Sequence, residues 1–379
     1  MLLKKPLMGF NTWNTFGYEP NEKIVLDTVD AFVEKGYKDA GYEYIIIDDC
    51  WSEHKRDENG RLVANKEKFP HGMKYIADYV HSKGLKFGMY SDAGFFTCAS
   101  FPGSYGYEMI DAETFAEWGV DYLKYDFGFF PSSAQAENAY LTMAQALRHS
   151  GRDIVFAACN WGEREPKNWM RSRGAHTYRS THDINDSPES YAKILESQLD
   201  QLEGSTFDCF NDMDMLTVGM YGNGMVGKNG MTYQHYVYHF LGWAFCGSPL
   251  IIGADVTKID PECEKLLLNK DIIAINQDED CRPPFRIANY YGRAHVMARL
   301  LANGDVAILC VDFHPVENGT TSDRLPVSFD DLGIRSNQGY GFEVTNVYTG
   351  ENLGVLVGGF SPELDRGEVR LYRLKLKKI

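Results

Sequence analysis

Short apolar runs alternate with longer amphipathic segments over the first three quarters of the chain. The run 42–47 is apolar and ends at Asp48, and the run 119–125 ends in the same way at Asp126. Segments such as 22–38 carry apolar residues at spacings of three and four, which predicts helices that bury one face. Strands alternating with helices predict a parallel sheet, and we count eight such units by about residue 275.

This count predicts an α/β fold, a (β/α)8 TIM barrel, because ~250 residues is the usual length of that architecture. The competing doubly wound sheet is disfavoured, since no G-x-G-x-x-G follows the first strand and no P-loop occurs. Beyond the barrel, short alternating runs such as 295–301 and 369–374 are separated by Gly, Asn and Asp turns. We therefore expect the barrel over residues 1–278 and an antiparallel β-sandwich over residues 279–379.

Composition and charge narrow the classes of partner. The 379 residues are 44% apolar, and 38 basic against 53 acidic side chains give a formal charge of 38 − 53 = −15. That balance argues against nucleic acid or an anionic membrane and leaves neutral small molecules. No window reaches the ~20 apolar residues of a membrane helix, and the N-terminal apolar run is too short for a signal peptide. We expect a cytoplasmic location, and assembly into a homo-oligomer is left open by the sequence.

Metal and nucleophile signatures are weak in this sequence. The eight cysteines contain no C-x-x-C pair, which argues against a zinc knuckle or a dense disulfide framework, and most should be reduced. His235 and His239 lack the glutamate of an H-E-x-x-H motif, so we expect them to pack in a helix. An all-oxygen Mg²⁺ or Ca²⁺ site at Asp212 and Asp214 stays open as a minor alternative. Otherwise no metal and no cofactor is expected, and neither a G-x-S-x-G elbow nor a phosphate cradle occurs.

Polar and aromatic residues gather at the predicted strand ends, where (β/α)8 enzymes build their active sites. Carboxylates accept hydrogen bonds from sugar hydroxyls, and aromatic faces pack against the C–H side of a sugar ring. Two carboxylates flanking a glycosidic bond are the simplest chemistry for such a rim. The strand-end residues are Trp13, Asp48, Asp49, Trp51, Tyr90, Asp92, Lys124, Asp126, Asn160, Trp161, Arg179, Asp183, Asp212 and Asp214.

Lys124 and Asp126 lie two residues apart on one face of a strand. A single pair of this kind is more often a strand-end salt bridge than part of a catalytic site. Its sequence context changes that interpretation. Ordered motifs accompany it along the barrel, namely MGFNTW (8–13), IDDCW (47–51), KEKFPHG (66–72), GMYSD (88–92), FPGSYG (101–106), YLKYD (122–126), CNWG (159–162), YRSTHDIND (178–186), NDMDML (211–216) and AINQD (274–278).

As a set, these motifs resemble glycoside hydrolase family 27, which holds α-galactosidases and α-N-acetylgalactosaminidases. The resemblance implies an exo-acting, retaining hydrolase of terminal α-linked galactose, acting on a small or oligosaccharide galactoside. Asp126 matches the family's nucleophile and Asp183 its acid/base, with the two carboxyls about 5 Å apart. We expect burial or a negative neighbour such as ionised Asp126 to raise the pKa of Asp183.

The same match assigns the substrate-binding residues. Asp48 and Asp49 would accept the O6 and O4 hydroxyls, and Lys124 and Arg179 would donate to O3 or O4 and to O2 or O3. Asn160 would face the C2 substituent. The remaining matches are Trp13 as a stacking surface and Tyr90, Asp214 and Met215 as pocket walls.

Three departures from the family pattern bear on function. The family's galactosidases usually carry Glu, and its N-acetylgalactosaminidases Ser, at the position of Asn160. The Trp161-Gly162 that follows resembles plant galactosidases and favours galactose. Gly128 replaces a cysteine that in many relatives pairs with Cys98, and Cys50 also lacks its partner. Phe210 and Met213 replace a usual Trp and Pro, which nothing in the sequence explains.

Alternatives within the family are an α-N-acetylgalactosaminidase and, disfavoured by retention of Asp48, a β-L-arabinopyranosidase. An alternative of another class is a catalytically silent barrel that binds sugars.

Overall fold

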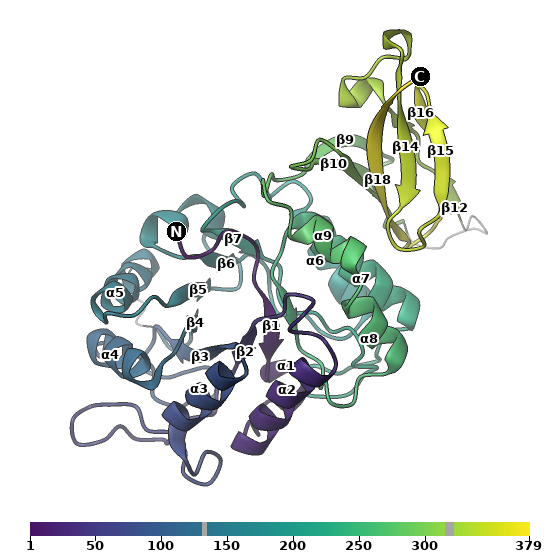
Figure 1. Ribbon diagram of the computed structural model, residues 1–379. Coiled ribbons are helices and arrows are strands. Elements are labelled where there is room, and N and C mark those ends of the chain that lie inside the picture. Colours follow the sequence, from purple (N-terminus) through teal and green to yellow (C-terminus); the bar gives the residue numbers. More distant parts are fainter. Residues whose placement is uncertain (131–134, 315–321) are drawn as a thin grey trace.

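Eight parallel strands form a closed barrel surrounded by helices in the computed structural model, which describes residues 1–130, 135–314 and 322–379 (Figure 1). The strand order is β7-β6-β5-β4-β3-β2-β1-β8, and a parallel bridge between Leu216 and Ile252 joins the segment after β7 to β8. The expected (β/α)8 barrel is confirmed. Its strands are β1 (Met8–Asn11), β2 (Tyr44–Ile46), β3 (Lys86–Asp92), β4 (Tyr122–Asp126), β5 (Val155–Cys159), β6 (Thr177–Arg179), β7 (Phe210–Asp212) and β8 (Leu250–Ile252).

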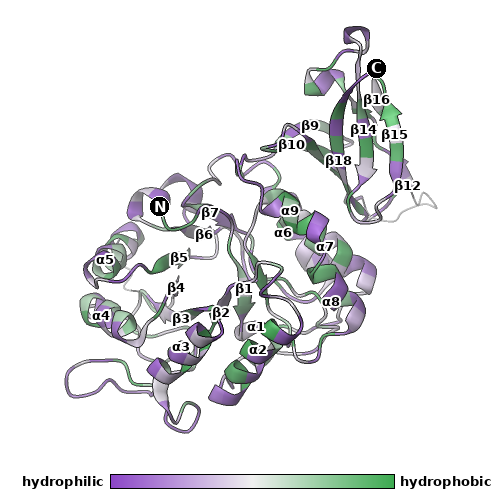
Figure 2. Cartoon of the chain, viewed as in Figure 1, coloured by the Kyte–Doolittle hydropathy of each residue, from purple (hydrophilic) through white to green (hydrophobic). Residues whose placement is uncertain are grey.

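Several helices around the barrel, α2, α3 and α5 among them, bury one face and carry both hydrophobic and hydrophilic residues (Figure 2). In α2 the side chain of Asn21 caps the first turn, and Val25, Val29 and Phe32 point into the core because they share one face. The helices are α1 (Trp13–Phe16), α2 (Glu22–Glu34), α3 (Gly72–Ser82), α4 (Glu108–Trp118), α5 (Ala136–His149), α6 (Pro188–Gln198), α7 (Tyr233–Cys246), α8 (Pro261–Leu267) and α9 (Lys270–Asn276). Two 3₁₀ turns, η1 (Pro166–Asn168) and η2 (Arg171–Arg173), follow β5.

The two histidines of α7 pack as the sequence predicts. His235 closes a capping box with Thr232, while His239 is fully buried and stacks on Tyr191. Burial lowers the pKa of His239 to about 3, so this ring is neutral. Neither histidine belongs to a metal-type cluster among the described residues.

The C-terminal part is the expected antiparallel sandwich. Its larger sheet has the order β15-β14-β18-β11-β10-β9, and two short two-stranded sheets pack on it around a separate apolar core. The last barrel helix ends at Asn276 and the first sandwich strand begins at Phe285. The strands are β9 (Phe285–Tyr290), β10 (Ala294–Leu300), β11 (Val306–Asp312), β12 (Ser322–Arg324), β13 (Val327–Ser328), β14 (Tyr340–Asn346), β15 (Asn352–Leu356), β16 (Gly359–Phe360), β17 (Glu363–Asp365) and β18 (Val369–Lys378), with short turns η3 (Asp330–Leu332) and η4 (Ser336–Gln338).

The outer face of the large sheet packs on the barrel. Val369 and Leu371 of β18 belong to the same apolar core as the barrel, and β18 lies against α7. The buried guanidinium of Arg299 donates to the Phe245 carbonyl at the end of α7, with 3.1 Å between Nη1 and the oxygen. Apolar packing and a buried hydrogen bond therefore join the two parts.

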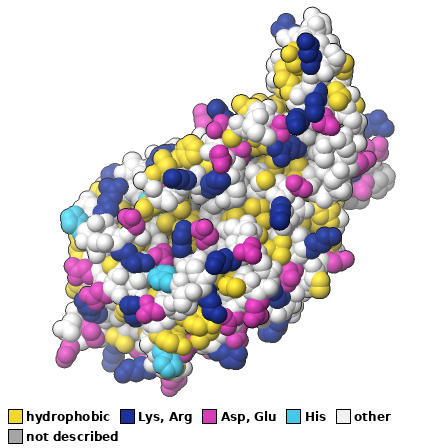
Figure 3. Space-filling model, in the orientation of Figure 1, with side chains coloured by type: hydrophobic (Ala, Val, Ile, Leu, Met, Phe, Trp, Pro, Cys, Tyr) yellow, Lys and Arg dark blue, Asp and Glu magenta, His cyan; other side chains and the backbone are white. Residues whose placement is uncertain are grey.

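The surface carries mixed charge. On the face shown in Figure 3, Lys and Arg side chains are interspersed with Asp and Glu and form no continuous basic area. Within the described residues, every helix is too short or too polar to cross a lipid bilayer.

Candidate active site

A cavity of about 320 Å³ opens at the carboxyl ends of the barrel strands. Ten of the eleven sequence-predicted site residues line it, and Asn160 is the exception. The ten are Trp13, Asp48, Asp49, Tyr90, Lys124, Asp126, Arg179, Asp183, Asp214 and Met215. The cavity is therefore built by residues from the ends of most of the strands, as the barrel geometry predicts.

Asp126 ends β4 at the base of this cavity and is 6% exposed. Its Oδ2 accepts a hydrogen bond of 2.9 Å from the Tyr90 hydroxyl, whereas its Oδ1 has no partner among the described residues. Burial raises the pKa of Asp126, and the Lys124 ammonium and the Tyr90 hydroxyl oppose that shift because they favour the carboxylate. One oxygen is thus oriented and the other is free to react.

Lys124 and Asp48 form a buried ion pair beside Asp126. The Lys124 ammonium lies 2.8 Å from Asp48 Oδ2, which also accepts a 2.7 Å bond from Asn11. Burial acts to lower the pKa of Lys124, but the neighbouring carboxylates, Asp48 first, outweigh it and hold that pKa well above its usual value. Lys124 is therefore a permanent cation in the cavity wall.

Asp49 is held by the backbone rather than by a cation. Its Oδ1 accepts from the Cys50 amide at 2.7 Å and its Oδ2 from the Ala99 amide at 3.1 Å. Burial raises the pKa of Asp49 to about 6, against these hydrogen bonds. After β2, therefore, Asp48 is paired with the Lys124 ammonium, whereas the adjacent Asp49 is held by backbone amides.

Arg179 bridges two carboxylates at the end of β6. Its Nη2 lies 2.6 Å from Asp214 Oδ2 and 2.8 Å from Asp183 Oδ1. Asp214 and Arg179 are buried, whereas the side chain of Asp183 is 66% exposed at the cavity mouth. Burial raises the pKa of Asp214 to about 6 against the pull of Arg179. Asp183 is therefore the one predicted catalytic carboxyl that solvent reaches freely.

Both carboxylate oxygens of Asp214 accept hydrogen bonds from the protein. Its oxygens accept from Arg179 and from the amides of Ile184 and Met215, while Asp212 accepts from the Asp214 amide. These bonds shape the turn after β7 instead of leaving an open oxygen cage. One metal-type cluster among the described residues, formed by Asp92, Cys98 and Asp126, reaches the cavity through Cys98 and Asp126.

Asn160 closes a turn instead of lining the cavity. It is 1% exposed, and its Nδ2 donates to the Glu163 carbonyl at 2.5 Å. Trp161, which follows it, lines the cavity in its place. Contact between Asn160 and a C2 substituent stays a prediction, and the residue from this strand end that lines the cavity is Trp161.

Other cavity residues come from positions that sequence reasoning missed. Met225 and Val226 belong to a long loop after β7, and the Val226 amide donates to the Asn14 carbonyl at 3.2 Å. No periodicity or motif marks this loop as part of the site. Trp161, one of the predicted strand-end residues, also lines the cavity, and the remaining lining residues are Asn14, Cys98, Ile184 and Asn185.

Cys98 and Gly128 lie as the lost disulfide predicts. A Cβ atom placed on Gly128 would be 3.0 Å from the Cys98 sulfur. Cys98 is a free, exposed thiol at the cavity wall, 3.8 Å from Asp126 Oδ2, and all eight cysteines are free. Although the residue is exposed at the surface, its sulfur is partly desolvated beside Asp126, and this desolvation and the carboxylates of Asp126 and Asp92 raise the pKa of the Cys98 thiol and favour its protonated form.

Both parts of the chain are similar to α-galactosidases. A family model described as α-galactosidase A matches residues 13–278, and a model of the α-galactosidase C-terminal β-sandwich domain matches residues 291–374. The α-galactosidase of Cyamopsis tetragonoloba is 38% identical over 370 residues, which cover 97% of this chain and 86% of that protein.

Solved α-galactosidase structures are similar to this chain over nearly its full length. The α-galactosidase I of Mortierella vinacea superposes with a TM-score of 0.88 at 32% identity, covering 98% of this chain and 97% of that one. The α-galactosidase of Saccharomyces cerevisiae, solved with raffinose, gives a TM-score of 0.87 at 27% identity, covering 99% and 98%.

Proposed function

This chain belongs to glycoside hydrolase family 27 and is a glycoside hydrolase of the α-galactosidase type, and we propose that it acts with retention through Asp126 and Asp183. The observation that carries the mechanism is the pairing of a buried, oriented carboxylate with an exposed one in a single cavity. Asp126 has one free oxygen, and Asp183 stands at the mouth, where a leaving group departs and water enters.

In the first step, Asp126 Oδ1 attacks the anomeric carbon while the bond to the glycosidic oxygen breaks. Asp183 gives its proton to that oxygen, and the leaving group departs as an alcohol. In the second step, Asp183 takes a proton from water, whose oxygen attacks the anomeric carbon and releases Asp126. Two inversions leave the sugar with its original α configuration.

The cavity walls support a preference for galactose. Asp48 and Asp49 are adjacent acceptors, and the Lys124 ammonium beside them is a donor that stays charged. An axial O4 and a primary O6 lie on the same side of a galactose ring, so one group of acceptors can hold both. Trp13 supplies an aromatic surface for the ring.

The test is release of p-nitrophenol from the α-galactoside, compared with the α-N-acetylgalactosaminide and the β-L-arabinopyranoside. We expect the galactoside to be the best substrate. Asp126→Ala should lower kcat by at least about 10⁴-fold, and Asp183→Ala by about 10²- to 10⁴-fold on substrates with poor leaving groups. Asp271→Ala on α9 is the matched control and should keep full activity.

The stereochemistry separates this mechanism from an inverting one. Proton NMR of the first product formed from p-nitrophenyl α-galactoside should show α-galactose, before mutarotation. If β-galactose appears first, or if Asp126→Ala keeps its activity, the mechanism is wrong. A chain that hydrolyses none of the three glycosides would instead be the silent sugar-binding barrel.

We also propose that the enzyme works in a reducing, cytoplasmic environment. Its eight cysteines are free, and the position next to Cys98 that could hold a disulfide partner is occupied by Gly128. Fractionation of cells that express the chain at its native level tests the location. Recovery of the activity outside the cytoplasm would refute it.

A further inference from the structure

A group of potential metal ligands lies in the sandwich, outside the catalytic cavity. It consists of Asp312 at the end of β11, His314 two residues later and Asp323 in β12. One oxygen or nitrogen atom from each of these side chains lies within 4.8 Å of the other two. The three residues are not among the described residues that line the cavity. We call this group the β11–β12 cluster, and the proposed catalytic steps make no use of it.

Asp312 is held in place by its backbone. Its amide donates to the Glu368 carbonyl at 3.1 Å, and its carbonyl accepts from the Gly367 amide at 2.6 Å. The side chain is fully buried, and its Oδ1 accepts from the His314 amide at 2.8 Å. Its Oδ2 has no hydrogen-bond partner among the described residues. A buried carboxylate with an unpartnered oxygen carries a desolvation cost that a bound cation would offset.

The contacts of the His314 ring decide which of its nitrogens can bind a cation. Its Nε2 lies 3.4 Å from the Tyr291 carbonyl oxygen, which can only accept, so Nε2 carries a proton. In the neutral ring Nδ1 is then an acceptor, and it lies 2.8 Å from Asp312 Oδ1, which is also an acceptor. Two acceptors this close need a proton or a metal cation beside them. A backbone carbonyl at the other ring nitrogen is a usual support of a metal-binding histidine.

Asp323 favours a metal cation over a proton at this place. Its Oδ2 lies 3.9 Å from His314 Nδ1 and 3.8 Å from an Nη atom of Arg366, and both distances are longer than a hydrogen bond. A proton on Nδ1 would therefore serve Asp312 alone, whereas a cation among the three side chains would contact both carboxylates and the imidazole. The side chains of His314 and Asp323 are 16% and 27% exposed, so an ion and water can reach them.

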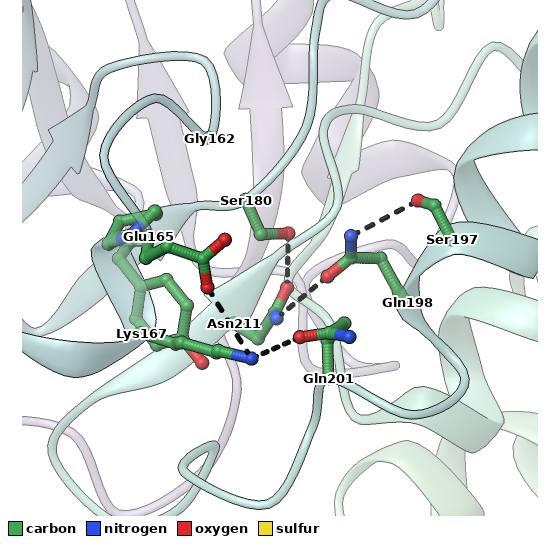
Figure 4. A pocket seen from close by; sticks show the side chains of 10 residues that line it. Gly162, Glu165, Lys167, Ser180, Ser197, Gln198, Gln201 and Asn211 are labelled. Carbon is green, nitrogen blue, oxygen red and sulfur yellow. Dashed lines mark hydrogen bonds and ion pairs between the residues drawn. The ribbon is translucent and has the colours of Figure 1, made fainter.

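The polar recess beside α6 shows the opposite arrangement (Figure 4). Its side chains bond to one another, with Gln198 held between Asn211 and Ser197, and Lys167 donating to Gln201. Polar groups that are already paired gain little from a ligand. The unpartnered oxygen of Asp312 therefore distinguishes the β11–β12 cluster from this recess.

We propose that the β11–β12 cluster binds one Zn²⁺ ion through Asp312, His314 and Asp323, with water in the remaining position. Two carboxylates and an imidazole suit Zn²⁺, whereas Mg²⁺ and Ca²⁺ prefer ligand sets made of oxygen alone. The ion would join the end of β11, in the large sheet, to β12, which forms a small sheet with β17. Because the site lies outside the cavity, this inference does not depend on the proposed function.

Zinc binding to the full chain tests the proposal. The wild type, Asp312→Asn and His314→Gln are dialysed against EDTA and then titrated with ZnCl₂, and bound zinc is measured by equilibrium dialysis. Each variant should bind one Zn²⁺ ion fewer per chain than the wild type, because loss of a ligand should raise the dissociation constant at least about 100-fold. Counting the difference separates this ion from any zinc held elsewhere, including at Cys98.

His81→Gln is the matched control. His81 also contacts one carboxylate, Asp121, with 2.7 Å between Nε2 and the oxygen, but it belongs to no metal-type cluster among the described residues. This variant should bind as many zinc ions as the wild type. All four proteins should hydrolyse p-nitrophenyl α-galactoside at the same rate, because neither the cluster nor His81 touches the cavity.

Thermal unfolding gives an independent measurement. Zn²⁺ at about 100 times its dissociation constant should raise the Tm of the wild type by about 5 °C more than that of His314→Gln, since an ion that binds only the folded state stabilises it. If the wild type and both cluster variants bind the same number of zinc ions, or if Zn²⁺ shifts their Tm equally, a proton alone lies between His314 and Asp312 and the proposal is wrong.

Discussion

The buried carboxylate of Asp49 in the candidate active site lowers the stability of the folded protein. Its carboxyl is 2% exposed, and burial raises its pKa from 3.8 to about 6. A shift of that size means that the ionised form costs about 3 kcal/mol in the folded protein relative to the unfolded chain. The cost is present above the folded pKa and disappears as the pH falls toward 3.8.

Asp49→Asn should therefore stabilise the protein at pH 7.5 and less so at pH 5. The amide cannot accept both backbone hydrogen bonds, which removes part of the gain, so we expect a net effect of about 1 kcal/mol at pH 7.5. Thermal unfolding of both forms across this pH range measures it, with Asp271→Asn as the exposed control. A difference in Tm that does not change with pH would contradict the assigned pKa. The same variant should lose kcat/KM, because a sugar-hydroxyl acceptor is gone.

Gly128, which follows β4, lies against Cys98, which follows β3. Gly128→Cys should form a disulfide with Cys98, since the Cβ position lies 3.0 Å from the sulfur. Closing the loop of 128 − 98 = 30 residues should stabilise the oxidised protein by about 3 kcal/mol, less the strain of moving Asp92 Oδ2, which the same Cβ would approach to 2.9 Å.

Thiol titration and unfolding with and without reductant measure the effect. Gly128→Ser carries a similar side chain without the thiol and controls for strain. If Gly128→Cys stays reduced under oxidising conditions, the two strand ends do not lie as close together as this geometry requires. Activity should persist, because Cys98 contacts Asp126 at Oδ2, the oxygen that Tyr90 also holds, and not at the proposed attacking oxygen Oδ1.

The loop after β7 depends on one buried carboxylate. Asp186 accepts from the Gly222 amide at 2.6 Å and from the Tyr236 hydroxyl at 3.1 Å, and its amide donates to the Val226 carbonyl. Asp186→Ala keeps the backbone contact with Val226 but leaves the Gly222 amide without its carboxylate partner. The loop that carries Met225 and Val226 should therefore loosen, and KM should rise about tenfold, with a smaller effect on kcat. Asp186→Asn keeps an acceptor and should restore most of the affinity. Equal losses in both variants would mean that the carboxylate acts through its charge.

Part of the fold and of the candidate site could be predicted from the sequence. The barrel and the sandwich followed from the pattern of strands and helices. Most of the ten cavity residues stand at predicted strand ends, which a barrel brings to one face, and the family resemblance implied the set. Contact between Asn160 and the sugar stays a prediction, and a strand-end position does not reveal that the Asn160 side chain donates to the Glu163 carbonyl. Met225 and Val226 were missed because their place depends on long-range contacts with Asp186 and Asn14 that leave no local pattern.

The barrel and the sandwich share one continuous hydrophobic core. Leu371 lies in the sandwich strand β18 but is fully buried in the core that the barrel helices share. The barrel and sandwich should therefore unfold together. The chain offers a direct probe, because its six tryptophans, Trp13, Trp51, Trp118, Trp161, Trp169 and Trp243, all lie within the barrel.

Leu371→Ala should lower the midpoint of unfolding measured by tryptophan fluorescence, although the substitution lies outside the barrel. A buried Leu→Ala change costs about 2 to 5 kcal/mol, and in a cooperative molecule that loss appears at every probe. Lys375→Ala, on an exposed position of the same strand, should leave the midpoint unchanged. If fluorescence does not move while circular dichroism reports early loss of β-structure, the sandwich unfolds on its own. The packing of β18 on α7 would then orient the sandwich without stabilising the catalytic barrel.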